Sequence, residues 1–152
     1  MVALTARSSL GVLLTSLLFL GGCAEPFIVM AGGELAGEET DPPADWDEFA
    51  DEDIVQLETR PDDPYSINIW MIADGADVYV ATGDGPTRWT RHIENNPDVR
   101  LRIQDRVYAL EAYRVLDPTE KLRIGQQYVS KYDVDDDNNW VEEGQLFRLD
   151  RR

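Results

Sequence analysis

The sequence predicts a small, mainly β domain with two helices inserted between antiparallel strands. Two observations carry this prediction. Short runs that alternate apolar with polar residues recur between turn signals, which is typical of half-buried strands. Two other segments instead carry the start and stop signals of helices. A chain with this order of elements folds as a small barrel or as an α+β sheet.

The first three strands are predicted from alternation and from one turn. Residues 54–59 form a first β-like run, and residues 65–73, "YSINIWMIA", form the clearest one. In the second run alternate apolar residues point to one face. The dipeptide Asp74-Gly75 separates this run from residues 77–83, "DVYVATG". Because Asp-Gly between two such runs favours a tight turn, we expect a hairpin here.

Two helices are predicted from their end signals. Pro86 suits a first helical position and Asn96-Pro97 ends the pattern, so a short helix is expected over about residues 86–95. Farther along, an N-cap residue, a proline and an acid occur within residues 117–120. This capping pattern predicts a second helix that ends near Lys131.

The remaining strands form a second hairpin and the end of the chain. Residues 99–115 alternate in the manner of two strands and turn near Gln104-Asp105. Residues 145–150, "QLFRLD", predict a last strand. Strands thus lie on both sides of each predicted helix, as an antiparallel fold with inserted helices requires.

The first residues predict export and lipidation. Arg7 is the only charged residue before Glu25, and a short apolar run follows it. A basic start with such a run forms a signal peptide, here residues 1–22. The sequence Leu20-Gly21-Gly22-Cys23 resembles the lipobox of bacterial lipoproteins, which implies cleavage before Cys23 and acyl chains on that residue. A plain secretory signal with an incidental cysteine and an uncleaved anchor are the open alternatives.

Lipidation at Cys23 predicts a place in the cell envelope. More than one acyl chain anchors a protein stably to a membrane. Ala24 follows the cysteine, which in a Gram-negative organism implies sorting to the outer membrane, facing the periplasm. Residues 23–45 are rich in glycine, proline and acidic residues and predict a tether. The folded domain is therefore expected over residues 46–152.

The charge of the chain excludes one large class of partners. The chain has 14 basic and 30 acidic residues, for a net charge of −16. A field of this sign repels phosphates, so we expect no binding of nucleic acid. Length and apolar content fit one domain with its own core rather than a disordered acidic tail. Five arginines nevertheless fall between Arg88 and Arg106.

No metal site or acid–base pair is predicted. The chain has one histidine, His92, and one cysteine, which excludes a zinc site or a Cys/His dyad. His92 is expected to face solvent or an anion, and no acid–base partner for it is identifiable. Residues 133–139 space carboxylates like a calcium loop, but Asn138 replaces the mid-loop glycine and Gly144 the last glutamate. A surface acidic loop is the favoured interpretation.

Residues 65–115 resemble the split β-barrel proteins of the pyridoxamine 5′-phosphate oxidase-like group. The matching pattern is a hairpin that ends in "VYVATG", a helix with Trp89 near its start, and "NPDVRLRI" leading into the next strand. The segment from Trp89 to Pro97 is also similar to the deazaflavin-dependent nitroreductase-like branch. The resemblance implies a split antiparallel β-barrel with two inserted helices. It also implies a homodimer that often binds FMN, a deazaflavin or haem at its interface.

The resemblance further implies a cofactor groove where the first hairpin meets the short helix. A helix N-terminus and nearby arginines attract the phosphate of such a cofactor. The positions that match the family's cofactor-binding residues are Tyr79, Ala81, Thr82, Thr87, Arg88 and Arg91. Trp46, Trp70 and Trp140 are candidates to stack on a flavin ring, although tryptophans at strand spacing more often belong to the core.

The groove also departs from the family pattern. The segment "TGDGPTRW" replaces the family's usual serine and lysine, and Asp84 in it repels a phosphate. Acidic residues interleave with the arginines, so the other interpretation is a solvated face of ion pairs without a cofactor. The sequence therefore supports two functions. One is a membrane-anchored oxidoreductase that depends on a flavin or deazaflavin, and the other is a non-enzymatic lipoprotein that binds an envelope protein or a small ligand.

Overall fold

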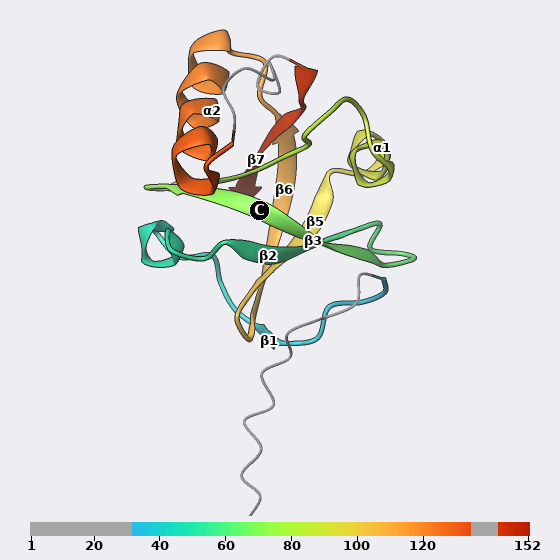
Figure 1. Cartoon of the computed structure of the whole chain (residues 1–152). Helices are drawn as coiled ribbons and strands as arrows, with labels where there is room; N and C mark the ends of the chain where they lie inside the picture. The colour runs from blue at the N-terminus through green and yellow to red at the C-terminus, as the bar shows by residue number, and fades with distance from the viewer. Residues whose placement is uncertain (1–31, 135–142) are drawn as a thin grey trace, which may run out of the picture.

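The computed structural model describes residues 32–134 and 143–152 (Figure 1). The predicted signal, Cys23, Trp140 and most of the acidic loop lie outside these residues. The elements follow in the order β1 (Glu38–Glu39), the short 3-10 helix η1 (Asp47–Phe49), β2 (Ile54–Thr59), β3 (Tyr65–Asp74), β4 (Asp77–Ala81), α1 (Arg88–Asn95), β5 (Asp98–Ile103), β6 (Arg106–Arg114), α2 (Pro118–Tyr132) and β7 (Leu146–Arg151). Neither helix in this part of the chain has the length and apolar character needed to cross a bilayer.

The strands close into a barrel. Neighbouring strands follow the order β6-β5-β2-β3-β4-β7, and β7 pairs back onto β6. All these pairings are antiparallel, whereas β1 is an extra strand that pairs in parallel with the first residues of β6. The structure confirms the split antiparallel β-barrel with two helices. It excludes the open α+β sheet, because the pairing of β6 with β7 leaves no free edge between them.

Alternate residues of the strands fill the barrel interior. Ile67, Ile69 and Met71 of β3 face inward, as their alternation predicted. Trp46 is 1% exposed, and its indole meets the Tyr108 ring edge-on at a centroid distance of 5.1 Å. Burial of a large apolar side chain contributes about 1.5–3 kcal/mol to folding. Trp46 is therefore a core residue and is not available to stack on a ligand.

Helix α2 covers the outer face of the β3–β4 hairpin and of β7 (Figure 1). It starts where predicted, because the Asp117 carboxylate accepts a hydrogen bond from the Glu120 N–H at 2.8 Å. Ile124 and Tyr128 of the helix pack on the outward side chain of Tyr79. The Tyr128 hydroxyl donates to the main-chain oxygen of Tyr79 at 3.1 Å. These contacts fix α2 against the hairpin.

Helix α1 begins two residues later than predicted because Thr87 caps it. The Thr87 hydroxyl accepts from the Thr90 N–H, and the Thr90 hydroxyl accepts from the Thr87 N–H. Trp89, Thr90 and Ile93 are buried against the barrel. The helix therefore presents Arg88 and its other polar residues on the outer side.

Residues 32–40 lie along the barrel and are called here the N-terminal strap. Leu35 is buried in this segment, and the Glu38 N–H donates to the main-chain oxygen of Asp105 at 2.7 Å. A Cβ atom on Gly37 would lie 2.7 Å from the same Asp105 oxygen, so glycine permits this close approach. The strap belongs to the segment that the sequence assigned to the tether, and this part of it packs on the barrel.

Candidate functional site

Arginines gather around the ring of Tyr65, at the start of β3. The Arg88 guanidinium lies 4.6 Å from the centroid of that ring, and the Arg60 guanidinium lies 6.0 Å from it. The His92 ring meets the Tyr65 ring edge-on at 5.2 Å. Arg91 is close enough to lower the pKa of His92. We call Arg60, Tyr65, Arg88, Arg91 and His92 the cationic corner.

Three segments that are separate in the sequence build the cationic corner. Strand β2 ends at Thr59, and Arg60 follows it in left-handed backbone with a φ of 58°. Tyr65 opens β3, and α1 supplies the other members. The Thr59 hydroxyl lies 2.9 Å from Nδ1 of His92. This hydrogen bond ties α1 to the end of β2 and so fixes the arrangement.

The positive charge of the corner comes from its arginines and not from His92. Burial lowers the pKa of His92 below its ordinary value, and the charges of Arg60, Arg88 and Arg91 lower it further. Asp63 acts in the opposite direction with a smaller effect. Since these neighbours disfavour the imidazolium, His92 is neutral at pH 7.

The arginines of the corner have few carboxylate partners. Within the described residues, Arg88 and Arg91 have no carboxylate at ion-pair distance. Arg60 pairs with Asp63 at 3.0 Å, but the Asp63 side chain is 79% exposed. The buried Nε of Arg60 has no acceptor in the same part of the chain. An exposed pair of this kind is weak, so the corner keeps a local positive charge.

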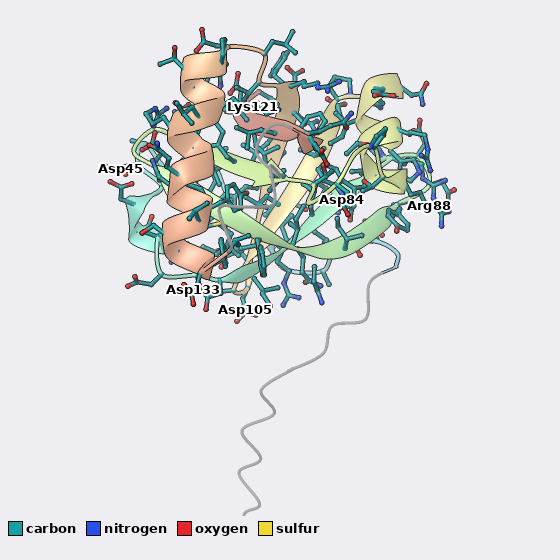
Figure 2. All side chains as sticks on the ribbon, turned by 45° about the horizontal axis from the view of Figure 1, so that its top comes forward. Asp45, Asp84, Arg88, Asp105, Lys121 and Asp133 are labelled. Carbon is teal, nitrogen blue, oxygen red and sulfur yellow. The ribbon has the colours of Figure 1, made fainter. Side chains whose placement is uncertain are left out.

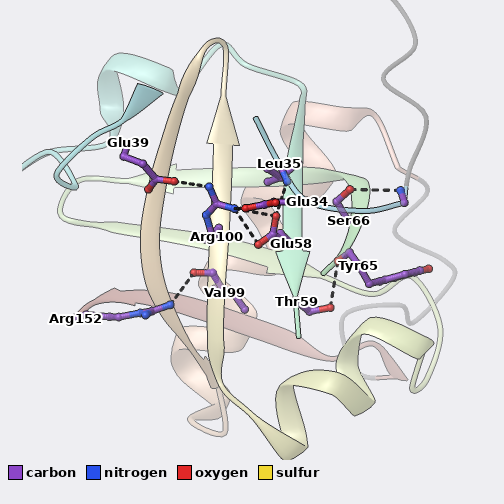
Figure 3. Close-up of polar contacts among 11 residues, drawn as sticks. Glu34, Leu35, Glu39, Glu58, Thr59, Tyr65, Ser66, Val99, Arg100 and Arg152 are labelled. Carbon is purple, nitrogen blue, oxygen red and sulfur yellow. Dashed lines mark hydrogen bonds and ion pairs between the residues drawn. The ribbon is translucent and has the colours of Figure 1, made fainter. Parts of the chain in front are cut away.

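Arg100 of β5, in contrast, is paired with carboxylates (Figure 3). It donates to both carboxylate oxygens of Glu58 at 3.1 Å and pairs with Glu39 of the strap. The Glu58 side chain is 3% exposed and also accepts a hydrogen bond from the Leu35 N–H at 2.5 Å. The strap thus covers a buried ion pair.

The ion-pair interpretation of the arginine-rich segment is therefore correct for only one part of it. Arg100 and Arg102 of β5 pair with carboxylates, in the second case with Asp105 at 3.3 Å. Arg88 and Arg91 of α1 have no such partner in the described chain. The two groups differ because Glu58 of β2 and Glu39 of the strap lie against Arg100, whereas no carboxylate of the described residues lies at ion-pair distance from Arg88 or Arg91.

A cleft opens on the outer face of the barrel, beside the end of β4. Its volume is about 430 Å³, which lies in the range of small-molecule sites. Figure 2 shows Asp84 on the loop that leads into α1, with Arg88 in the first turn of that helix. The cleft is lined by Trp70, Ala81, Thr82, Gly83, Asp84, Tyr128 and Val134. A second hollow of about 270 Å³ shares Trp70 and Ala81 with it.

Trp70 is held rigidly at the cleft. Its indole stacks on the Tyr132 ring of α2 with a centroid distance of 4.4 Å and an interplanar angle of 7°. The Tyr132 hydroxyl in turn accepts from the Met71 N–H at 3.0 Å and donates to main-chain oxygen at 2.8 Å. The indole is nevertheless 46% exposed. A fixed aromatic surface therefore remains open to a ligand.

No family model matches the chain, and no curated protein matches its sequence. Solved structures share its architecture. A pyridoxamine 5′-phosphate oxidase-type protein from Listeria innocua is 17% identical over 66% of this chain and 85% of its own, with a TM-score of 0.53. A FAD-binding protein from Mesorhizobium loti is 16% identical over 68% and 84%, with a TM-score of 0.51. An F420-H2 dependent reductase is 12% identical over 77% and 100%, with a TM-score of 0.55.

The chain has the split-barrel fold. In this split barrel the predicted groove residues fall into separate places. Ala81 and Thr82 line the cleft, and Arg88 and Arg91 belong to the cationic corner. Tyr65 at the corner and Trp70 at the cleft both belong to β3, about 17 Å apart at the rise of a β-strand. Their side chains leave opposite faces of the strand, because Tyr65 packs against the barrel core whereas Trp70 stacks on Tyr132 of α2 outside it. The loop that carries Asp84 connects the cleft with the start of α1.

Two of the predicted groove residues have structural roles in the split barrel. The Thr87 hydroxyl is engaged in capping α1. Tyr79 is completely buried beneath α2, and its hydroxyl donates to Glu120 at 2.9 Å. Burial first and Glu120 second raise the pKa of Tyr79 to about 12. Its side chain is therefore a neutral part of the packing under α2 at physiological pH.

Sequence reasoning missed Arg60 and Tyr65. The two residues flank the turn between β2 and β3, which pair in antiparallel register from Thr59 and Tyr65 onward. That turn was a signal for their proximity, because consecutive antiparallel strands bring the residues at a turn together. The docking of α1 beside them was not visible in any local pattern.

Metal ligands do not cluster in the described part of the split barrel. Among residues 32–134 and 143–152, no group of three or more His, Cys, Asp or Glu side chains is arranged to hold a metal ion. The carboxylates of the calcium-like pattern after Val134 lie mostly outside these residues.

Proposed function

We propose that this protein binds a flavin-type cofactor, FMN or a deazaflavin, on the outer face of its barrel and acts as an oxidoreductase. The observation that carries the proposal is the cationic corner, where Arg88 and Arg91 have no carboxylate partner among the described residues of a chain with a net charge of −16. An anion site in such a chain requires a local exception of this kind. A FAD-binding protein and an F420-H2 dependent reductase among the similar structures support the same class of ligand.

The residues present fit a cofactor of this class. Guanidinium groups bind phosphate through charged, paired hydrogen bonds. Arg88 lies in the first turn of α1, where unpaired N–H groups of the helix also favour an anion. A phosphate oxygen would supply the acceptor that the buried Nε of Arg60 lacks. The open face of Trp70 suits a planar ring at the other end of β3.

When bound, the cofactor supplies the redox chemistry. The residues of this chain bind and orient it. The cationic corner holds the anionic end, and Trp70 packs against the ring. Asp84 lines the cleft and places a carboxylate near that ring, which weakens the binding of a ligand with a net negative charge.

Absorbance spectra and titration calorimetry of the full-length protein in detergent test this function. A flavin spectrum in the purified protein, or a micromolar Kd for FMN or a deazaflavin, supports it. Haem binding without flavin binding would replace the proposed class of cofactor. A colourless protein that binds none of the three overturns the proposal and selects the cofactor-free alternative, a lipoprotein that binds a partner protein or another small ligand.

We also propose that Cys23 anchors the protein to the cell envelope, at the outer membrane facing the periplasm in a Gram-negative cell. The sequence Leu20-Gly21-Gly22-Cys23 supports this proposal. Cys23→Ser should abolish labelling with a palmitate analogue and leave the precursor unprocessed. Equal labelling of the wild type and the variant would contradict the anchor.

We further propose that the protein forms a homodimer through the surface beside the cleft. Ile54 is 60% exposed and Trp70 is 46% exposed, and the two residues pair across β2 and β3. Neighbouring exposed apolar side chains of this size are typical of an interface. Ile54→Glu should shift the protein toward the monomer in analytical ultracentrifugation. A wild-type protein that sediments as a monomer at micromolar concentration would contradict the dimer.

A further inference from the structure

Gln145 stands beside the cleft, immediately before β7. Its main-chain oxygen accepts a hydrogen bond from the Thr82 N–H at 2.9 Å, and its own N–H donates to the Thr82 hydroxyl at 2.8 Å. Thr82 in turn lines the cleft. These two hydrogen bonds hold the main chain of Gln145 in place at the end of β4, and they therefore also fix the position from which its side chain extends.

The side-chain amide of Gln145 is buried without being fully satisfied. The residue is 6% exposed, and its Oε1 finds no hydrogen-bond donor in the part of the chain that the structure describes. Buried amide oxygens nearly always have a donor, because their desolvation is otherwise uncompensated. The donor for this acceptor comes from outside the described protein atoms, from a water molecule or from a ligand in the neighbouring cleft.

A small cavity lined by Gln145 lies next to the cleft. Its volume is about 10 Å³, roughly the space that one polar atom needs. Ala81, Thr82 and Tyr128 line both this cavity and the cleft. Gln145 is thus separated from the cleft only by residues that line both hollows.

The two ends of the site have opposite hydrogen-bonding character. The Oε1 of Gln145 and the carboxylate of Asp84 are acceptors, whereas the guanidinium groups of the cationic corner are donors. A ligand that satisfies both ends has its anionic group at the corner and an N–H group in the cleft.

We propose that Gln145 is a specificity-determining residue whose Oε1 accepts a hydrogen bond from an N–H group on the planar ring bound in the cleft. This inference rests on the proposed flavin-type function and deepens it, because it names the edge of the ring that is recognised. The pyrimidine edge of a flavin or deazaflavin ring carries an imide N–H. The periphery of haem carries none, so Gln145 selects the first two ligands against haem.

FMN and 3-methyl-FMN test the inference, because the second compound carries a methyl group in place of the imide hydrogen and keeps the phosphate; loss of the preference in Gln145→Leu then separates a lost hydrogen bond from simple crowding by the methyl group. The full-length wild-type protein should bind FMN at least about ten-fold more tightly than 3-methyl-FMN. In Gln145→Leu, whose main chain keeps both bonds to Thr82, this preference should disappear. Arg88→Ala should weaken the binding of both compounds and leave the preference unchanged.

Gln56→Leu is the matched control. Gln56 is 7% exposed, like Gln145, but its side chain lies on β2 and bonds to Asn68 and Arg102. This variant should keep the preference for FMN.

Equal affinity of the wild type for the two compounds, or a preference that survives in Gln145→Leu, overturns the role of Gln145 and leaves the proposed function standing. The comparison of the two compounds on the wild type needs no variant, so it remains decisive if Gln145→Leu fails to fold. A wild-type protein that binds neither compound overturns the proposed function, and the role of Gln145 falls with it.

Discussion

The barrel has two groups of arginines that differ in what surrounds them. Arg100 on β5 lies against the buried carboxylate of Glu58 and beneath the strap, whereas Arg88 at the cationic corner lies on the Tyr65 ring without a carboxylate partner in the described chain. Both come from the same basic stretch of sequence. Local charge density therefore does not distinguish an arginine in a structural ion pair from one without a carboxylate partner. The two kinds of arginine are distinguished by the segments of the chain that pack against them.

The largest expected effect concerns the paired group. Glu58→Ala removes the buried carboxylate of Arg100, which keeps only the exposed carboxylates of the strap, and it removes the acceptor of the Leu35 N–H. Loss of one partner of a buried pair lowers the free energy of unfolding by about 3–5 kcal/mol. Urea denaturation of the two proteins measures this loss.

Arg88→Ala is the matched variant for this first prediction. Because Arg88 is exposed and its only contact in the described residues is with Tyr65, its removal should cost less than about 1 kcal/mol of stability. Equal destabilisation by the two variants would abolish the distinction between the groups.

The second prediction concerns ligand binding, where the unpaired group of arginines matters more than the paired group. Arg88→Ala should weaken FMN binding by about 1.5–3 kcal/mol, roughly ten- to a hundred-fold, because it removes a charged hydrogen-bond partner of the phosphate. Titration calorimetry measures the change. The exposed Arg114 at the end of β6 provides the control, and Arg114→Ala should bind FMN like the wild type.

Asp84→Asn is expected to change the affinity for FMN in the direction opposite to Arg88→Ala. It should strengthen FMN binding, because it removes a negative charge from the cleft and keeps an acceptor there. A cofactor that binds equally to the wild type, Arg88→Ala and Asp84→Asn has its phosphate elsewhere on the surface.

A smaller effect is expected at the strap. Gly37→Ala places a methyl group 2.7 Å from the Asp105 oxygen and should push the strap away from β6. We expect a loss of about 1–2 kcal/mol in the free energy of unfolding, faster amide exchange at Glu38, and unchanged affinity for FMN. Gly85→Ala is the control, since a Cβ there meets nothing within 4 Å. Slow exchange at Glu38 in Gly37→Ala would show that the strap tolerates the methyl group.

The smallest effect is the pH dependence that His92 contributes. Its pKa in the folded protein lies below the ordinary value of 6.5, so the unfolded chain binds a proton more readily. The stability from this group is therefore present above about pH 6.5 and is lost as the pH falls through the lowered pKa. Between pH 7.5 and pH 5.5 the Tm of the wild type should fall more than that of His92→Gln. Parallel curves would mean that the arginines do not act on His92.

Local patterns predicted most of the fold, because alternation and capping are local properties. The β3–β4 hairpin followed from Asp74-Gly75, and the start of α2 followed from Asp117. The closed barrel was predicted only from the resemblance to the split-barrel proteins, since no local pattern in the sequence indicates that β6 pairs with β7. The strap escaped prediction because β1 is only two residues long and has no apolar periodicity.

The candidate site was less accessible to sequence reasoning than the fold. Thr82 and Arg88 were found because a strand end and a helix start flank the same short loop. Alternation places Tyr79 on the same outward face as Ala81, but it does not reveal that α2 covers Tyr79. Gln145 had no signal at all, because its buried oxygen becomes visible only once β7 lies beside β4.

If Cys23 carries the proposed acyl chains, the place where the strap leaves the barrel limits how the protein is oriented on the membrane. The Gly32 N–H donates to the Ser66 hydroxyl at 3.3 Å, and Ser66 is the chain neighbour of Tyr65 in the cationic corner. A fully extended chain from Cys23 to Gly32 spans at most about 30 Å. Acyl chains on Cys23 would therefore tether the protein to the membrane through a short segment that joins the barrel near the cationic corner. With such an anchor the cationic corner would lie near the bilayer, and a soluble ligand would approach it through the layer between the protein and the lipid headgroups.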